Sequence, residues 1–186
     1  MINNISKLVD SWKTPNDGSR SLFESILNTP IKQALKDWTK FSNSKGILIG
    51  GSAVSFWVKP RMTHDLDILF VSDEEIPSYV ESFKKTRPHC FLHKETHIEV
   101  EVLSPKYLKL PSGWYSIILK TAKESNGILI ADKAALIALK LLRASYQDKH
   151  DIQELLSLGN IDLTAYKLSN DQNKLLDEII HHTKHL

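Results

Sequence analysis

A glycine-rich turn followed by a pair of aspartates is the feature of this sequence that most restricts its fold. Gly50-Gly51-Ser52 is separated by twelve residues from Asp65-Leu66-Asp67, and each motif borders an apolar run. Residues 46–49 predict a short buried strand that opens into the glycines, where the backbone can approach a ligand closely. A helix is expected after the turn, and the positive end of its dipole favours a phosphate.

The two aspartates alternate with apolar residues, which predicts a strand over about residues 65–71. Because side chains alternate between the faces of a strand, Asp65 and Asp67 lie on the same face. Two neighbouring acids on an apolar strand call for a cation, and Mg2+ prefers carboxylate oxygens and bridges to phosphate. The alternative is a solvated strand end. The glycine turn upstream favours the metal, and the pair is predicted to belong to a nucleotide site.

Gly51 and Ser52 are predicted to hold the nucleotide phosphate, through backbone N–H groups and the serine hydroxyl. The alternative is an ordinary strand-to-helix turn in which serine caps the helix and no ligand is needed. Taken alone, the turn favours that alternative. The acid pair that follows it favours a phosphate site.

Composition and charge limit the classes of protein that remain. The 186 residues suit one compact domain, or one with a small helical appendage. A net charge of +2 is too small to indicate a nucleic-acid partner by itself. The single cysteine, Cys90, excludes an intramolecular disulfide and fits a reducing cytoplasm. The sequence shows neither the apolar core of a signal peptide nor a membrane span, so a cytoplasmic protein with no membrane partner is expected.

The remaining pattern predicts an α+β fold, with a small mixed sheet flanked by helices and a helical C-terminal region. A helical segment is expected over residues 2–41, with one helix starting at Thr29-Pro30. Asn126-Gly127 predicts a tight turn, and Asp132 predicts the cap of an amphipathic helix. Further helices are expected over 53–58, 72–85, 148–158 and 171–185, and further strands over 90–93 and 96–103.

Two motifs together resemble the signature of the polymerase-β-type nucleotidyltransferases. They are Ile49-Gly50-Gly51-Ser52-Ala53 and Arg61-Met62-Thr63-His64-Asp65-Leu66-Asp67-Ile68-Leu69-Phe70, and the resemblance covers about residues 45–158. Within that superfamily the chain is most similar to the small bacterial branch of AbiEii-like and MenT-like toxins. We accordingly divide it into an N-terminal helical segment (1–44), a nucleotidyltransferase core (45–131) and a C-terminal helical region (132–186).

The resemblance implies an enzyme that uses Mg2+ or Mn2+ and transfers a nucleoside monophosphate from an NTP such as ATP. The acceptor would be a hydroxyl of a tRNA end or of a protein side chain. The setting would be a toxin–antitoxin or phage-defence system, with a cognate antitoxin as a possible partner. The alternative is a catalytically degenerate member that acts as a binding or antitoxin-like module.

Members of the superfamily show a third acid on a neighbouring strand. The strand at 96–103 carries His97, Glu99 and Glu101 on one face, and spacing does not choose between the two glutamates. The family position corresponds to Glu101, just before the last apolar pair of the strand. This carboxylate would take the proton of the acceptor hydroxyl or bind a second metal ion. A half-exposed strand whose acids face water is the alternative.

The resemblance also assigns a role to a lysine on the helix after Asp132. Lys140 would contact the triphosphate or, alternatively, extend along the apolar helix face to the surface. Asp148 and Asp151 match the spaced aspartates that follow this lysine in the family. Gln147 stands where the family often has arginine, which argues against a salt bridge and favours helix capping for Asp148.

Lys59 and Arg61 lie in the loop before the acid pair, and one of them is expected to neutralise a phosphate. The family pattern, which has an arginine near this position, favours Arg61. A local basic patch is also predicted, either to contact a tRNA end or simply to form a solvated surface. Its members are Lys59, Arg61, Lys84, Lys85 and Arg87.

Overall fold

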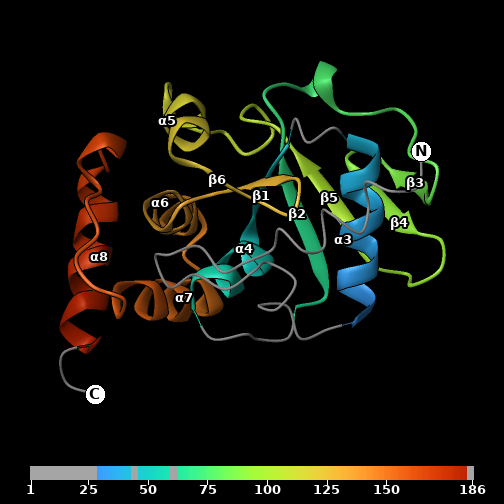
Figure 1. Ribbon diagram of the computed structural model, residues 1–186. Helices are drawn as coiled ribbons and strands as arrows, with labels where there is room; N and C mark the ends of the chain where they lie inside the picture. The colour runs from blue at the N-terminus through green and yellow to red at the C-terminus, as the bar shows by residue number, and fades with distance from the viewer. Residues whose placement is uncertain (1–28, 43–45, 59–62, 184–186) are drawn as a thin grey trace.

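The described residues form one seven-stranded mixed sheet with helices packed around it (Figure 1). The computed structural model describes residues 29–42, 46–58 and 63–183. The predicted helical stretch before Thr29, the division of the chain at residue 44, and Lys59 and Arg61 lie outside these ranges. The strands are β1 (Ile47–Ile49), β2 (Asp65–Leu69), β3 (Phe83–Arg87), β4 (Cys90–His93), β5 (Glu99–Leu103), β6 (Lys123–Ser125) and β7 (Ile128–Ile130).

The strand order is β3-β4-β5-β2-β1-β7-β6. β2 pairs with β5, and β1 with β7, in parallel, whereas the other neighbouring strands are antiparallel. The helices are α3 (Thr29–Ser42), α4 (Gly50–Trp57), α5 (Trp114–Thr121), α6 (Lys133–Arg143), α7 (Tyr146–Leu156) and α8 (Asn170–Thr183). This architecture confirms the α+β class with a mixed sheet and a helical C-terminal region. The boundary at residue 131 stays a prediction.

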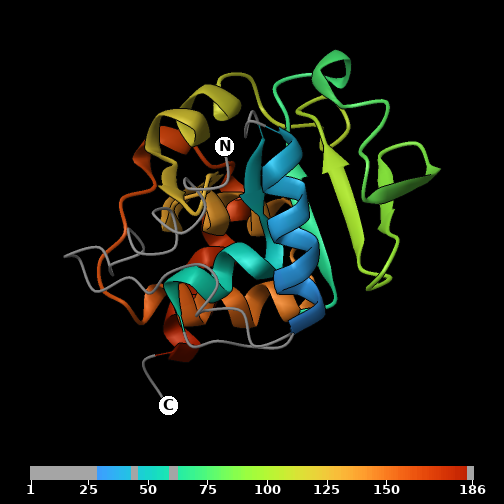
Figure 2. The same cartoon turned by 45° about the vertical axis from the view of Figure 1, so that its right-hand side comes forward.

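Helix α3 lies against one face of the sheet (Figure 2). The Trp38 ring packs edge-on against Phe83 and Phe91, with ring centroids 5.4 and 5.7 Å apart. The buried His93 accepts a hydrogen bond from the Thr96 N–H at Nδ1, so its Nε2–H donates to Asp37 Oδ2 at 3.1 Å. These contacts attach α3 to β3 and β4.

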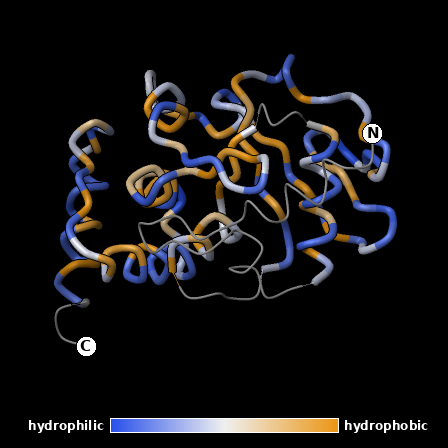
Figure 3. Tube along the Cα trace, viewed as in Figure 1, coloured by the Kyte–Doolittle hydropathy of each residue, from blue (hydrophilic) through white to orange (hydrophobic). Residues whose placement is uncertain are grey.

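The core is continuous across the central strands and the inner sides of α3, α4 and α6. Figure 3 shows hydrophobic residues gathered in those strands, whereas the edge of the sheet around β3 is mostly hydrophilic. Cys90 is buried in β4. Among the described residues, no helix combines the length and the apolar character needed to cross a membrane.

The helix predicted over residues 72–85 is wrong. Only a short 3-10 helix, η1 (Asp73–Glu75), follows Ser72, and the chain re-enters the sheet as β3 at Phe83. Phe83 is buried, whereas the next four residues are exposed. The acidic start resembles a helix cap, but Pro77 disfavours a continuing helix and the edge position beside β4 decides the strand.

Two local predictions are confirmed at the other end of the sheet. Asn126 and Gly127 both have positive φ, 55° and 77°, and join β6 to β7 in a tight turn. Asp132 caps α6, because its side chain accepts a hydrogen bond from the Ala135 N–H at 2.7 Å. The polypeptide therefore passes directly from the sheet into the helix that bears Lys140.

Candidate active site

The parallel pairing of β2 and β5 sets the acids side by side. Asp67 is the register partner of Glu101, and Asp65 is the partner of Glu99, so all four project from the same face of the sheet. Asp67 and Glu101, hereafter the carboxylate row, both line a cavity of about 400 Å³. Asp65 and Glu99 are not among its lining residues. The sheet register therefore places Glu101, rather than Glu99, beside Asp67 in the cavity.

Glu99 has a partner of its own at the edge of the sheet. Its Oε1 accepts a hydrogen bond from Arg87 at 2.6 Å, in a pair in which both side chains are exposed to solvent. Arg87, a member of the predicted basic patch, thus pairs with an acid of β5, across the intervening strand β4. Lys84 and Lys85 are exposed on the same strand β3.

Gly50 is required because it leaves room for Asp67. Its φ is +66°, and a Cβ atom built on it would stand 1.8 Å from Asp67 Oδ2. No side chain other than hydrogen fits there, and the positive φ disfavours other residues further. The first glycine of the motif therefore serves the position of the Asp67 carboxylate, in addition to any contact with a ligand.

Asp67 carries a charge that its surroundings do not neutralise. Burial, and after it the charges of Asp65 and Glu101, raise the pKa of Asp67 to about 7, although the charges of Arg143 and Lys140 act in the opposite direction. At neutral pH this carboxyl is partly protonated without a ligand. A cation bound at the carboxylate row would favour the ionised form of Asp67.

Ser52 and Thr63 hold the start of β2. Ser52 is 1% exposed, and its hydroxyl donates to the Asp65 carbonyl oxygen at 3.2 Å, across thirteen residues of chain. The Thr63 hydroxyl lies 3.4 Å from both the carbonyl oxygen and Oδ1 of Asp65. The Ser52 hydroxyl thus has a structural partner, and the predicted phosphate contact rests on the backbone N–H groups that begin α4.

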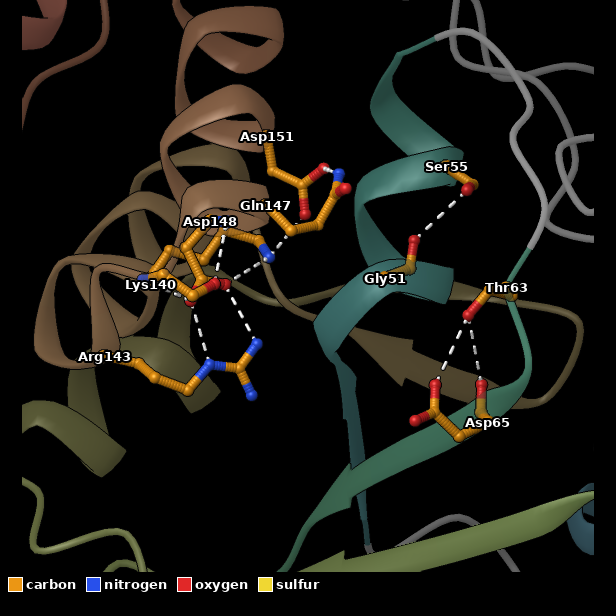
Figure 4. A network of polar contacts seen from close by, with 10 residues as sticks. Gly51, Ser55, Thr63, Asp65, Lys140, Arg143, Gln147, Asp148 and Asp151 are labelled. Carbon is orange, nitrogen blue, oxygen red and sulfur yellow. Dashed lines mark hydrogen bonds and ion pairs between the residues drawn. The ribbon is translucent and has the colours of Figure 1, made fainter.

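A second set of charges lies on α6 and α7, across the first turn of α4 from Asp65 and Thr63 (Figure 4). We call Lys140, Arg143, Asp148 and Asp151 the ion-pair network. The Lys140 ammonium is 3.2 Å from Asp148 Oδ1 and 2.6 Å from Asp151 Oδ2. Lys140 is only 6% exposed, so the alternative that it extends to the surface is wrong. It lines the cavity, and its predicted contact with a triphosphate stays a prediction.

Asp148 joins the network to the start of α7. It is the third residue of a capping box with Ser145, which confirms its capping role. Arg143 also binds it through two hydrogen bonds, from Nε at 2.9 Å and from the terminal amine at 3.0 Å. The expectation that Gln147 argues against a salt bridge at Asp148 is wrong, because the arginine comes from the preceding helix.

The pKa values of the network follow from this geometry. Burial alone would raise the pKa of Asp148, but hydrogen bonds from Arg143 and Ser145 and the charge of Lys140 outweigh it and hold that pKa well below its ordinary value. Asp151 is equally buried, and it accepts a further hydrogen bond from Gln147 at 3.0 Å. In the network each charge thus meets an opposite one, and Lys140, Asp148 and Asp151 are buried.

Arg143 is the site residue that the sequence did not single out. Its side chain is 75% exposed, it lines the cavity, and Asp148 fixes its guanidinium in a bidentate pair. The available signal is its position three residues after Lys140, which places both side chains on the same helix face. An arginine at this spacing on a solvent-facing helix end is otherwise unremarkable, because basic residues are common there.

The cavity has both a charged and an apolar lining. Its charged lining consists of Asp67, Glu101, Asp148, Lys140 and Arg143, so one negative charge is in excess when all are ionised. The rest of the lining consists of Ile49, Gly50, Leu103, Tyr107, Leu108, Leu110, Leu136, Leu139 and Leu142.

The donor chemistry of the carboxylate row fits a hard divalent cation. Oxygen ligands of this type suit Mg2+ and Mn2+. The raised pKa of Asp67 shows that its negative charge is not neutralised, and a bound cation would stabilise that charge. Within residues 29–42, 46–58 and 63–183, however, no three histidine, cysteine or acidic residues converge closely enough to form a metal site by themselves. A triphosphate that supplies further oxygen ligands would complete such a site.

Comparison with known proteins identifies the family of this chain. Residues 27–184 match the family described as nucleotidyltransferases of unknown function (DUF6036). The chain belongs to this family. No curated protein matches the chain in sequence. The match supports a nucleotidyltransferase-like protein and spans every element of the site, from α4 to α7.

Proposed function

We propose that this family member is a metal-dependent nucleotidyltransferase that transfers a nucleoside monophosphate from an NTP to a hydroxyl acceptor. The observation that carries the proposal is the juxtaposition of Asp67 and Glu101 in one cavity with Lys140 and Arg143. A metal–triphosphate complex requires carboxylates that bind the cation and basic side chains that bind the phosphates, and both line this cavity.

In the proposed reaction, the acceptor oxygen attacks the α-phosphorus of the NTP. A new O–P ester bond forms, the bond between the α- and β-phosphates breaks, and pyrophosphate leaves with the electron pair. The acceptor proton passes to a carboxylate, for which Glu101 is the candidate because it lines the cavity beside Asp67. Arg143 and Lys140 would bind phosphate oxygens and stabilise the charge on the leaving group.

Asp67, Glu101 and Asp65 are the residues that would hold Mg2+ or Mn2+. The metal ion, when bound, would polarise the phosphates and reduce the repulsion between them and the carboxylate row. The excess of carboxylates over cations in the cavity repels a free triphosphate. Nucleotide binding is therefore expected to depend on the divalent cation.

The finer assignments rest on the motifs that resemble the AbiEii-like and MenT-like branch. They are ATP or another NTP as donor, a tRNA end or a protein side chain as acceptor, and a cytoplasmic toxin–antitoxin or phage-defence setting with a cognate antitoxin. A catalytically degenerate binding module is the second candidate. It is favoured by the lack of a converged three-acid group among the described residues.

Transfer of radiolabel separates these possibilities. The pure protein is incubated with Mg2+, each α-labelled NTP in turn, and total tRNA or cell lysate. Label that moves to RNA or to protein identifies the acceptor class. Asp67→Asn and Glu101→Gln are each expected to lower the transfer rate by about a hundredfold or more, because each removes charge that acts on the reacting groups.

Thermal shift separates the enzyme from the binding module. Mg2+ with NTP is expected to raise the Tm of the wild type and not that of Asp65→Ala/Asp67→Ala. Stabilisation that persists in the double variant would reject metal-mediated nucleotide binding by these acids. Stabilisation of the wild type without transfer to any acceptor would favour the binding module.

A further inference from the structure

One end of the cavity is lined by leucines and one tyrosine, which have no role in the proposed transfer step. Leu108 and Leu110 come from the loop after β5, and Leu136 and Leu139 come from α6. A solvated cavity lined by leucines is unfavourable unless it receives an apolar group. The chemistry of this end therefore differs from that of the carboxylate row.

Along β5 the cavity lining changes from charged to apolar. On β5, Leu103 follows Glu101 by two residues on the same strand face, a rise of about 7 Å. The loop that follows Leu103 adds Tyr107, Leu108 and Leu110 to the lining, so the cavity has an apolar end beyond the C-terminus of β5.

Tyr107 is held in place at this apolar end. Its backbone N–H donates to Ser104 Oγ at 3.1 Å, in the turn directly after β5. Its ring packs on the His89 imidazole with centroids 4.8 Å apart and planes tilted by 32°. His89 Nδ1 in turn lies 3.2 Å from the Val102 carbonyl oxygen. The ring nevertheless remains 52% exposed and lines the cavity, so a fixed aromatic surface is available to a ligand.

We propose that the apolar end binds the nucleobase of the NTP and that Tyr107 is the surface on which the base stacks. The inference rests on the proposed function and adds a base-binding residue to it. An NTP is a strongly charged triphosphate joined through a sugar to a flat ring of low charge, and the two ends of the cavity match these two parts. Stacking on a tyrosine whose position is already fixed requires little ordering on binding.

Two kinds of ligand, with and without a base, distinguish binding of the base from binding of the phosphates. The full-length protein is titrated calorimetrically in Mg2+ with α,β-methylene analogues of the four NTPs and with inorganic tripolyphosphate, which has no base. Tyr107→Ala is expected to weaken the tightest-binding analogue about tenfold, because base–aromatic stacking is lost. Its affinity for tripolyphosphate is expected to stay within about twofold of the wild type.

Two variants control for folding and for the loss of any tyrosine. Tyr107→Phe keeps the ring, so it is expected to bind both ligands as the wild type does. Tyr79→Ala removes a tyrosine that is 64% exposed and does not line the cavity, so it is also expected to leave both affinities unchanged.

Other outcomes overturn the assignment in distinguishable ways. An equal loss for analogue and tripolyphosphate would mean that Tyr107 shapes the phosphate end. Unchanged analogue affinity in Tyr107→Ala would remove the base from this position, and a raised KM for the acceptor alone would make the apolar end the acceptor subsite. Each of these three outcomes would leave the proposed transfer reaction in place. If the wild type binds neither ligand in Mg2+, the proposed function fails together with this inference.

Discussion

The carboxylate row lines the same cavity as three members of the ion-pair network, Lys140, Arg143 and Asp148, but the charges of the two regions are balanced differently. Burial and neighbouring acids raise the pKa of Asp67 to about 7. In the network, Arg143, Ser145 and Lys140 lower the pKa of Asp148 in spite of its burial. One region therefore holds excess negative charge, whereas the other meets its own charges with hydrogen-bonded partners.

The difference separates a region that needs a ligand from one that maintains the fold. Partly buried charges without counter-charges lower stability, so their presence at the half-buried Asp67 and Glu101 calls for a function. A buried network with matched charges holds α6 against α7 and fixes the orientation of Arg143 without any ligand. Substitutions in the network should therefore cost stability, whereas neutralisation of the carboxylate row should increase it.

The largest expected effect on stability comes from Lys140→Met. The substitution leaves Asp148 and Asp151 buried with one cation fewer, which is expected to lower the free energy of unfolding by about 3–5 kcal/mol. Urea denaturation measures the change. Lys120→Met, at an exposed position on α5, is the matched control, and an equal change in both variants would contradict the role given to the network.

Gly50→Ala tests the close contact between the glycine turn and Asp67. A methyl group in the path of Asp67 Oδ2, on a backbone with φ of +66°, is expected to lower the free energy of unfolding by about 3 kcal/mol. Gly113→Ala has a similarly positive φ of +85° but no heavy atom within 4 Å of the new methyl group, so about 1 kcal/mol is expected.

A double variant isolates the contact from the backbone strain. Gly50→Ala/Asp67→Gly removes the carboxylate that the methyl group would meet, and its loss relative to Asp67→Gly alone should fall to about 1 kcal/mol. A loss that stays as large as in Gly50→Ala would place the conflict elsewhere.

Asp67→Asn tests the excess charge of the carboxylate row through its pH dependence. The pKa of Asp67 is about 7 in the folded protein against an ordinary value of 3.8, so the native state binds more protons between about pH 4 and pH 7. Wild-type stability therefore falls through this window as the pH rises. At pH 8 without metal, Asp67→Asn is expected to be more stable by on the order of 2 kcal/mol, an advantage that disappears towards pH 4.

Thermal unfolding across this pH range, with and without Mg2+, measures the effect. Mg2+ at pH 8 should raise the Tm of the wild type more than that of Asp67→Asn, since the cation favours the ionised carboxylate. A difference between the two proteins that does not vary with pH would contradict the raised pKa.

Glu99→Gln is expected to have the smallest effect. Its partner Arg87 is solvent-exposed and the pair lies outside the cavity, so the transfer rate should change by less than about twofold. Glu101→Gln in the same assay is the contrast. A loss in Glu99→Gln as large as that in Glu101→Gln would assign the third acid to Glu99 instead.

Much of the fold is readable from local patterns. Asn126-Gly127 specifies its turn because both positions adopt positive φ, and Asp132 specifies a helix start because its side chain satisfies a free N–H group. The helix predicted over residues 72–85, which the structure does not contain, shows that local signals do not predict strand pairing. There the acidic start of η1 is local, but the pairing of β3 with β4 is set by the sheet and by the packing of Phe83 on Trp38.

The candidate site divides in the same way. Period-two alternation places Asp65 with Asp67, and Glu99 with Glu101, on common strand faces, but the two pairs are equivalent until β2 and β5 are set in register. The sequence did not predict Arg143 as a site residue, because its orientation depends on a hydrogen bond to Asp148 of the next helix. The burial of Lys140 likewise depends on two aspartates of that helix.

Local sequence patterns specify the chemistry that is available: a glycine turn, acids that alternate along strands, and a lysine on an apolar helix face. These follow from backbone conformation and side-chain period, which are properties of neighbouring residues. Three features depend on tertiary structure. Glu101 rather than Glu99 lines the cavity with Asp67, Gly50 leaves space for the Asp67 carboxylate, and Lys140 is buried between two aspartates. Those outcomes depend on strand register and helix packing, which bring together residues that are distant in the chain.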